Sequence, residues 1–139
     1  MKEINIHSNP EYVRPNKNIC EKIIRFVFDL EKINQYEISI IFTSDIFVSD
    51  LKKRFFLKDQ WTDVIAFPLH TNKHEMIEGE IYISMPTAKK NSKQFKQSYE
   101  KEVARLIIHG SLHLIGYSDK SNSEKKNNVK NGRKYFKKN

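Results

Sequence analysis

The chain has 139 residues, of which 38% are hydrophobic and 30% are charged, and this size and balance are typical of one compact domain. Its single cysteine, Cys20, cannot form an intramolecular disulfide, which excludes a disulfide-stapled secreted fold and any four-cysteine zinc module. No apolar run approaches the roughly 18 residues of a membrane span and no export signal is recognisable, so we expect a cytoplasmic protein with no membrane partner.

The formal net charge of +8 is concentrated near the C-terminus. Residues 1–119 hold 17 lysines and arginines against 16 acidic residues, whereas residues 120–139 hold eight basic residues against Glu124 alone. Such a segment attracts polyanions by releasing their condensed counterions. We therefore expect one domain over 1–119 and a basic tail over 120–139 that is helical or partly disordered. The tail either contacts nucleic acid or is merely solvated.

The first part of the chain alternates strand and helix patterns. Residues 2–7 alternate polar and apolar side chains, as in a half-buried strand. From Pro15 to about residue 34, apolar residues recur every three or four positions, which predicts an amphipathic helix with that proline in its first turn. Residues 36–43 are β-branched and aromatic and predict a strand, after which Ser44 or Asp45 caps a second helix.

The next part predicts two more strands followed by helices. Short β-type runs at residues 64–67 and 80–84 are separated by a polar stretch, 69–78, that suits a hairpin-like connection. Helical periodicity is strongest over residues 98–115 and is ended by Gly116. This order predicts an α+β domain with one mixed sheet of about four strands and helices packed mainly on one face.

The last predicted helix carries a pattern typical of a metal site. His109 and His113 are four residues apart, so on a helix their side chains lie on one face with Cβ atoms about 5 to 6 Å apart. Catalytic zinc needs a third protein ligand and one open position. Gly116 lets the chain leave the helix through a left-handed cap, and Asp119 can then turn back to supply that ligand.

Two comparisons limit what this spacing establishes. His70 and His74 are also four residues apart, but they lie in a polar stretch without helical periodicity, which favours exposed loop histidines. The alternative for His109 and His113 is a pair of partly buried, hydrogen-bonded helix histidines. Position 110 is a glycine, so the general base of an HExxH metalloprotease is missing, which argues against peptide hydrolysis.

Several segments resemble a known family. Residues 109–119, HGSLHLIGYSD, are similar to the signature HGxLHLxGYDH of the YbeY endoribonucleases. KDQWTDVIAFP at 58–68 resembles the family's KDxxTDVLSFP, and GEIYIS at 79–84 resembles its GDIxIS. Glu102 and Arg105 stand where the family commonly has those residue types. The resemblance therefore spans most of the chain.

The resemblance implies a zinc-dependent endoribonuclease that cuts single-stranded RNA in 16S ribosomal RNA 3′-end maturation and ribosome quality control. It implies a metallohydrolase-like domain over 1–119, with a zinc-metalloprotease-like arrangement of the histidine helix. Three histidines usually bind the family's metal. Here His109 and His113 match the first two ligands of one Zn²⁺ ion, and Asp119 stands in place of the third. The expected partners are ribosomal RNA and the small ribosomal subunit.

A second departure from the family lies just before Lys58. The family often has tyrosine and arginine there, whereas this chain has Phe55 and Phe56. Lys58 and Arg105 are our candidate catalytic residues, because a cation can hold the scissile phosphate or neutralise developing charge. The alternative for Arg105 is an ion pair with Glu102, three residues earlier, worth only about 0.2 to 0.5 kcal/mol.

Other residues of the matched segments also have two interpretations. Trp61 and Phe67 either stack on unpaired bases or belong to the core. Thr62, Asp63 and Ser84 are treated as scaffold, since turn hydrogen bonds and capping explain such residues at least as often.

The function itself has alternatives. The nucleophile is either a metal-activated water or the ribose 2′-hydroxyl. A second hypothesis is a zinc-stabilised ribosome-assembly or RNA-binding factor with little or no nuclease activity. A third is a metallohydrolase acting on peptides or small molecules.

Overall fold

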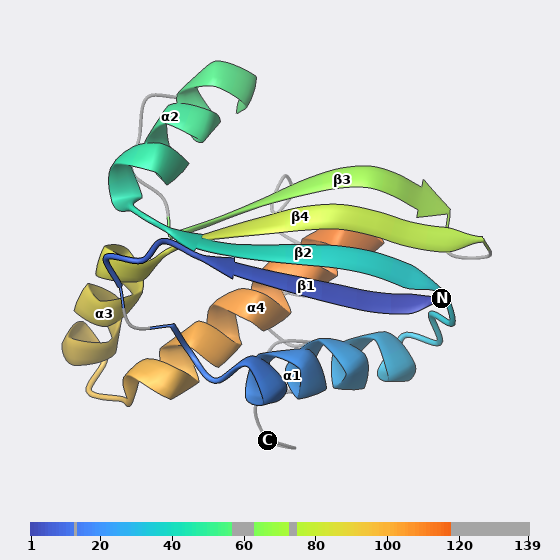
Figure 1. Ribbon diagram of the computed structural model, residues 1–139, viewed down its shortest axis with the longest axis horizontal. Coiled ribbons are helices and arrows are strands. Elements are labelled where there is room, and N and C mark those ends of the chain that lie inside the picture. The colour runs from blue at the N-terminus through green and yellow to red at the C-terminus, as the bar shows by residue number, and fades with distance from the viewer. Residues whose placement is uncertain (13, 57–62, 73–74, 118–139) are drawn as a thin grey trace.

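The computed structural model describes residues 1–12, 14–56, 63–72 and 75–117 (Figure 1). Within these ranges the elements are, in chain order, β1 (Lys2–Ser8), α1 (Lys17–Leu30), β2 (Tyr36–Thr43), α2 (Asp45–Phe56), β3 (Val64–Asn72), β4 (Met76–Ser84), α3 (Met85–Gln94) and α4 (Tyr99–Ile115). None of these helices is long and apolar enough to cross a membrane.

The four described strands form one mixed sheet in the order β1-β2-β4-β3. Strands β1, β2 and β4 are mutually parallel, whereas β3 runs antiparallel to β4 and lies at the edge. A parallel pair needs a crossover connection, and α1 joins β1 to β2 while α2 precedes the β3–β4 hairpin. The predicted α+β class with one mixed sheet is confirmed.

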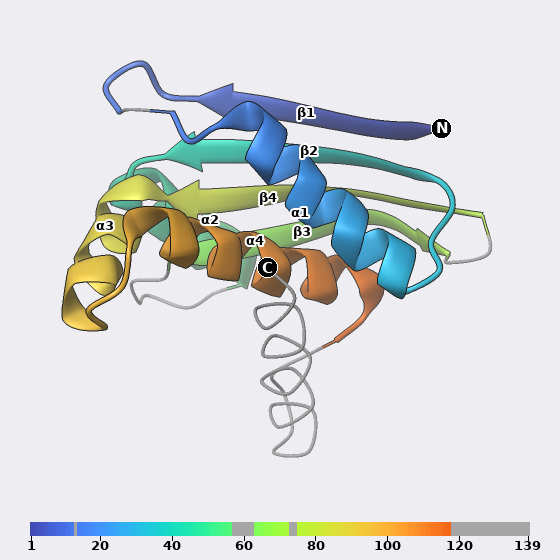
Figure 2. The same cartoon turned by 90° about the horizontal axis from the view of Figure 1, so that it is seen from below.

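The helices lie mainly on one face of this sheet, as predicted. In β4, Ile77, Ile81 and Ile83 are fully buried and alternate with Glu78, Glu80 and Tyr82, which stay partly exposed. Figure 2 shows α1 and α4 lying across the buried face, whereas α2 lies behind the sheet at one end. The sheet therefore has a core face, covered by α1 and α4, and an opposite face, here called the open face, which α2 covers only at one end.

Helix α1 is shorter than predicted. The side chain of Asn16 accepts a hydrogen bond from the backbone N–H of Ile19, so Asn16 is the N-cap and Pro15 lies outside the helix. At the other end Lys32 has a φ of 59°, which stops the helix after Leu30. Pro15 and Asn16 are adjacent, and each is a signal for the start of a helix. The sequence-based prediction used the proline and therefore began the helix slightly too early.

Strands β3 and β4 are longer than predicted, and His70 lies in β3 rather than in a loop. Its backbone is paired with Glu78, and its Nε2 lies 3.1 Å from Oε2 of Glu75. The outer end of β3 is exposed, so its side chains carry no apolar alternation that sequence reasoning could detect. The register shifts between Pro68 and His70, an irregularity suited to a proline in an edge strand. His74 lies outside the described residues.

Two glycines let α4 lie close against the sheet. A Cβ atom at position 110 would lie 2.7 Å from Cγ2 of Ile81, and one at position 79 would lie 2.5 Å from Cδ2 of Leu114 and 2.9 Å from the Phe67 carbonyl oxygen. No side chain fits at either distance without displacing its neighbour. Glycine at 110 and 79 therefore sets which face of α4 meets the sheet.

Candidate functional site

One stripe of α4 faces away from the core and carries two of the three predicted metal ligands. Lys101, Arg105, His109 and His113 follow one another at four-residue intervals, and none of the four is fully buried. The remaining surface of α4 packs inward through ten buried residues, Glu102, Val103, Leu106, Ile107, Ile108, Gly110, Ser111, Leu112, Leu114 and Ile115.

The two histidines lie side by side on this stripe. The ring centroids of His109 and His113 are 4.6 Å apart, and the ring planes are inclined by 54°. Both side chains are partly buried. Two imidazoles at this separation suit a shared divalent ion, because neutral histidine nitrogens are good zinc donors.

The chain leaves α4 as predicted at Gly116. That residue has a φ of 119°, and its N–H donates to the carbonyl groups of Leu112 and His113. The next N–H, of Tyr117, donates to the Leu112 carbonyl at 3.0 Å. Asp119 lies outside the described residues, and the part of the chain that the structure describes contains no group of three metal-binding side chains. The histidine pair therefore fits two ligands of an ion, and the third ligand stays a prediction.

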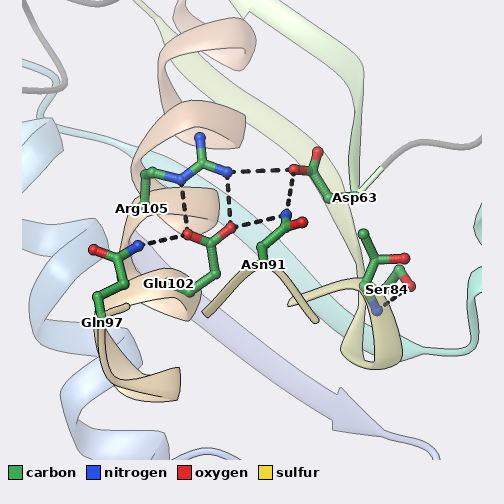
Figure 3. A network of polar contacts seen from close by, with 7 residues as sticks. Asp63, Ser84, Asn91, Gln97, Glu102 and Arg105 are labelled. Carbon is green, nitrogen blue, oxygen red and sulfur yellow. Dashed lines mark hydrogen bonds and ion pairs between the residues drawn. The ribbon is translucent and has the colours of Figure 1, made fainter. Parts of the chain in front are cut away.

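A partly buried ion cluster, centred on Glu102, lies one turn before the histidines (Figure 3). The Glu102 side chain is fully buried. Its Oε1 accepts hydrogen bonds from Arg105 Nε and Gln97 Nε2, both at 2.9 Å. Its Oε2 accepts from an Arg105 terminal nitrogen at 2.8 Å and from Asn91 Nδ2 at 3.1 Å. Four donors thus converge on one carboxylate, which makes its burial tolerable.

The same cluster reaches the start of β3. Oδ2 of Asp63 lies 3.3 Å from the Arg105 nitrogen that also contacts Glu102, and 3.2 Å from Nδ2 of Asn91. The Asp63 carbonyl accepts from the Ser84 N–H at 2.9 Å. Hydrogen bonding to Glu102 is the main cause that raises the pKa of Arg105, with burial acting against it. The guanidinium is thus held in place by two carboxylates.

The predicted pairing of Arg105 with Glu102 is confirmed, but the pair is not the exposed one that the predicted worth assumed. The figure of about 0.2 to 0.5 kcal/mol applies to exposed helix pairs. Here the carboxylate is 0% exposed, and removing the partner of a buried charge costs about 3 to 5 kcal/mol. Sequence spacing finds the pair but not its burial, which depends on Asn91 and Gln97 from neighbouring segments.

A family profile described as "YbeY: Endoribonuclease YbeY" matches residues 3–139. The chain belongs to the YbeY endoribonuclease family. The Endoribonuclease YbeY of Karelsulcia muelleri is 35% identical over 122 residues, which cover 88% of this chain and 85% of that protein. That of Chloroherpeton thalassium is 38% identical over 104 residues, covering 75% and 72%.

A solved structure supports the fold. The solution structure of TM1509 from Thermotoga maritima matches with a TM-score of 0.58 and 24% identity, over 97% of this chain and 90% of that one. At this identity the likeness shows the fold alone. The zinc-metalloprotease-like arrangement of the histidine helix stays a prediction.

Three segments shared with the YbeY family meet at the ion cluster. Asp63 comes from the segment at 58–68, Ser84 from the segment at 79–84, and Arg105 from the helix that carries the histidines. Ser84 also accepts a hydrogen bond from the Thr87 N–H at 3.3 Å and caps α3. Ser84 thus caps a helix and Asp63 joins the ion cluster, which are structural contacts of the kind predicted for scaffold residues. Sequence reasoning missed Asn91 and Gln97, because a polar residue in or after a polar helix gives no sign of which side chain it will contact.

Close packing of α4 against β4 explains why position 110 is a glycine. The buried position faces Ile81, and even a Cβ atom there would lie 2.7 Å from that side chain. A glutamate at 110 would therefore point into the sheet, so this helix cannot carry the HExxH general base. The structure agrees with the sequence argument against a peptidase of that type. Lys58, Trp61 and Thr62 lie outside the described residues.

Proposed function

We propose that the chain is a metal-dependent endoribonuclease that cuts single-stranded RNA in the maturation of the 16S ribosomal RNA 3′ end and in ribosome quality control. The observation that supports this most directly is the side-by-side placement of His109 and His113 on the partly exposed stripe of α4, in a chain of the YbeY family. The proposed partners are ribosomal RNA and the small ribosomal subunit, in the cytoplasm.

For the metal we propose one Zn²⁺ ion held by His109, His113 and Asp119. A bound zinc ion supplies Lewis acidity toward a phosphate oxygen and a lowered pKa for a coordinated water. The two imidazoles support this proposal through their separation and shared helix face. A carboxylate is an acceptable third donor for zinc.

The protein's own residues have distinct parts in this proposal. Gly116 ends α4 after the second histidine, three residues before Asp119 in the sequence. The hydrogen bonds of Arg105 to Glu102 and Asp63 support a positioning part for it rather than contact with the phosphate. Lys58 is then the side chain that we propose for phosphate contact.

Metal content and RNA cleavage of the wild type and His113→Ala test the proposal together. We expect one zinc ion per wild-type chain, and loss of both metal and cleavage in the variant. His70→Ala is the matched control, because His70 is a histidine of β3 that is 45% exposed and lies outside the proposed site. Cleavage that survives His113→Ala, with metal still bound, would falsify the proposed site.

The same assay separates the two nucleophiles and the second function. Cleavage that survives a 2′-deoxy substitution at the cut site requires water, whereas loss of cleavage indicates the 2′-hydroxyl. Phe56, in place of the family's usual arginine, favours the second candidate, an RNA-binding assembly factor. That candidate requires RNA affinity to persist in His113→Ala and the wild type to show no cleavage above the variant.

A further inference from the structure

A row of aromatic rings lies on the open face of the sheet, opposite α1 and α4. The ring centroids of Phe47 and Tyr82 are 6.0 Å apart, those of Tyr82 and Phe67 are 5.7 Å apart, and those of Phe67 and Phe55 are 5.3 Å apart. The row runs from the first turn of α2, across β4 and β3, to the last turn of the same helix. We call these four residues the aromatic row.

The two ends of the aromatic row are exposed. Phe55 is 60% exposed and Phe47 is 47% exposed. Of the seven large hydrophobic residues that are exposed in the described part of the chain, four belong to α2 or β3, namely Ile46, Phe47, Phe55 and Leu69. A single exposed apolar residue is ordinary, whereas a connected group of rings such as the aromatic row marks an interaction site. In Figure 1, α2 extends beyond the β3 edge of the sheet at this end.

The charges around the aromatic row are unevenly distributed. Lys52, Lys53 and Arg54 immediately precede Phe55, and the last two lie exposed in the final turn of α2. The strands place several carboxylates on the rest of the open face. Glu80 lies opposite Phe67 in the β3–β4 register, and the farther residues Glu37 and Glu78 are paired with each other.

The basic corner at the end of α2 thus differs in charge from the carboxylate-bearing part of the open face. The carboxylates repel phosphate, so a nucleic acid strand is favoured only at the corner formed by the end of α2. An exposed aromatic ring beside adjacent cations is the combination that proteins use for unpaired nucleotides, where a base stacks on the ring and the cations contact the backbone. A helix C-terminus also favours basic residues for its own stability, but that effect gives no reason for an exposed phenylalanine.

We propose that Phe55, flanked by Lys53 and Arg54, forms a stacking subsite for one unpaired base of single-stranded RNA. The proposal deepens the proposed function and rests on it. Phe67 supports the subsite from behind, since its ring meets that of Phe55 at an angle of 81°, an edge-to-face contact that fixes the orientation of the outer ring. This subsite lies apart from the histidine pair and extends the RNA contact to α2.

Equilibrium binding of a fluorescein-labelled ten-nucleotide oligoadenylate to the full-length protein tests the subsite. Anisotropy is read directly after mixing, and a gel checks that the RNA is intact. We expect Phe55→Ala to raise the dissociation constant about 5- to 150-fold, the range of one base–aromatic stack. Phe55→Trp should retain the wild-type value. Phe95→Ala is the matched control, because Phe95 is 59% exposed but follows α3.

Abasic substitutions in the RNA make the test specific. At one position of the oligonucleotide, removing the base should weaken wild-type binding and leave Phe55→Ala binding unchanged, because the stacking partner is already gone. If Phe55→Ala keeps the wild-type affinity for RNA while its far-UV circular dichroism is unchanged, the subsite is refuted. If Phe55→Ala changes the sedimentation of the protein but not its affinity for RNA, Phe55 belongs to a protein-binding surface, and the subsite is also refuted.

The binding test of the subsite and the cleavage test of the proposed function can fail independently of each other. A chain that binds RNA through Phe55 but never cleaves it would support the subsite and contradict the endoribonuclease proposal. A chain that loses cleavage with His113→Ala but binds RNA equally well with and without the Phe55 ring would support the endoribonuclease and contradict the subsite.

Discussion

Replacing Glu102 with glutamine tests the ion cluster with almost no change in side-chain shape. The carboxylate accepts from Arg105 and Gln97 through one oxygen and from Arg105 and Asn91 through the other. A glutamine keeps one of these oxygens and replaces the other with an NH₂ group. Whichever oxygen is replaced, the new donor faces two donors, and the two hydrogen bonds on that side are lost.

The expected loss of stability follows from this geometry. Each hydrogen bond to a charged group is worth about 1.5 to 3 kcal/mol, and breaking a buried ion pair costs about 3 to 5 kcal/mol. Arg105 is 38% exposed and keeps Asp63 as a partner. We therefore take the buried-pair range of about 3 to 5 kcal/mol as the upper limit of the stability that Glu102→Gln loses. That is a large share of the roughly 5 to 15 kcal/mol by which domains are stable.

Urea unfolding followed by circular dichroism measures this loss. Glu100→Gln is the control, because Glu100 is an exposed residue in the first turn of the same helix and its replacement should change the free energy of unfolding far less. Combining Glu102→Gln with Arg105→Gln should cost much less than the sum of the two single variants, since both act on one cluster. Losses in Glu102→Gln that match those of Glu100→Gln, or strict additivity with Arg105→Gln, would refute the reasoning.

Three further predictions concern packing, alkaline stability and the tail. Gly110→Ala should destabilise the fold by about 1 to 3 kcal/mol in urea unfolding, because its Cβ would lie 2.7 Å from Ile81, and an unchanged midpoint would contradict that contact. Burial raises the pKa of the Cys20 thiol to about 11 from 9.0, so the folded state holds this proton more tightly than the unfolded state does. The stability that this difference contributes is fully present below pH 9 and is lost as the pH rises toward 11. Wild-type stability should therefore fall by about 2 to 3 kcal/mol more than that of Cys20→Ala across this interval, and parallel pH profiles would count against it. Deleting residues 120–139 should make RNA binding less dependent on salt, because eight basic residues are lost; an equal slope for both proteins would reject the tail as a phosphate contact.

The elements that the sequence predicted well are those whose side chains alternate cleanly between core and solvent. Strand β2 alternates buried with partly exposed positions over Tyr36–Ile41 and then ends in two buried residues, and α4 buries a continuous stripe. The errors occur where side chains carry no such pattern. The outer end of β3 is exposed at successive positions, so only its backbone pairing with β4 defines it as a strand.

The candidate site divides in the same way. The pairing of His109 with His113 follows from a four-residue interval on one helix, which sequence reasoning can use directly. The burial of Glu102 follows from contacts with Asn91 of α3 and Gln97 of the α3–α4 connection. Only the link from Arg105 to Asp63, before β3, joins segments that are far apart in the chain. No local pattern contains that information, so the cluster could be found only once the elements had been placed in space.

The orientation of α4 links these two parts of the site. Gly110 and Gly79 let the helix approach β4 closely on one side, and this contact turns the stripe from Arg105 to His113 away from β4. At the start of that stripe, Arg105 holds Glu102 beneath the helix and Asp63 at the edge of the sheet. The packing that excludes a glutamate at position 110 is therefore the same packing that sets the direction in which both imidazoles point.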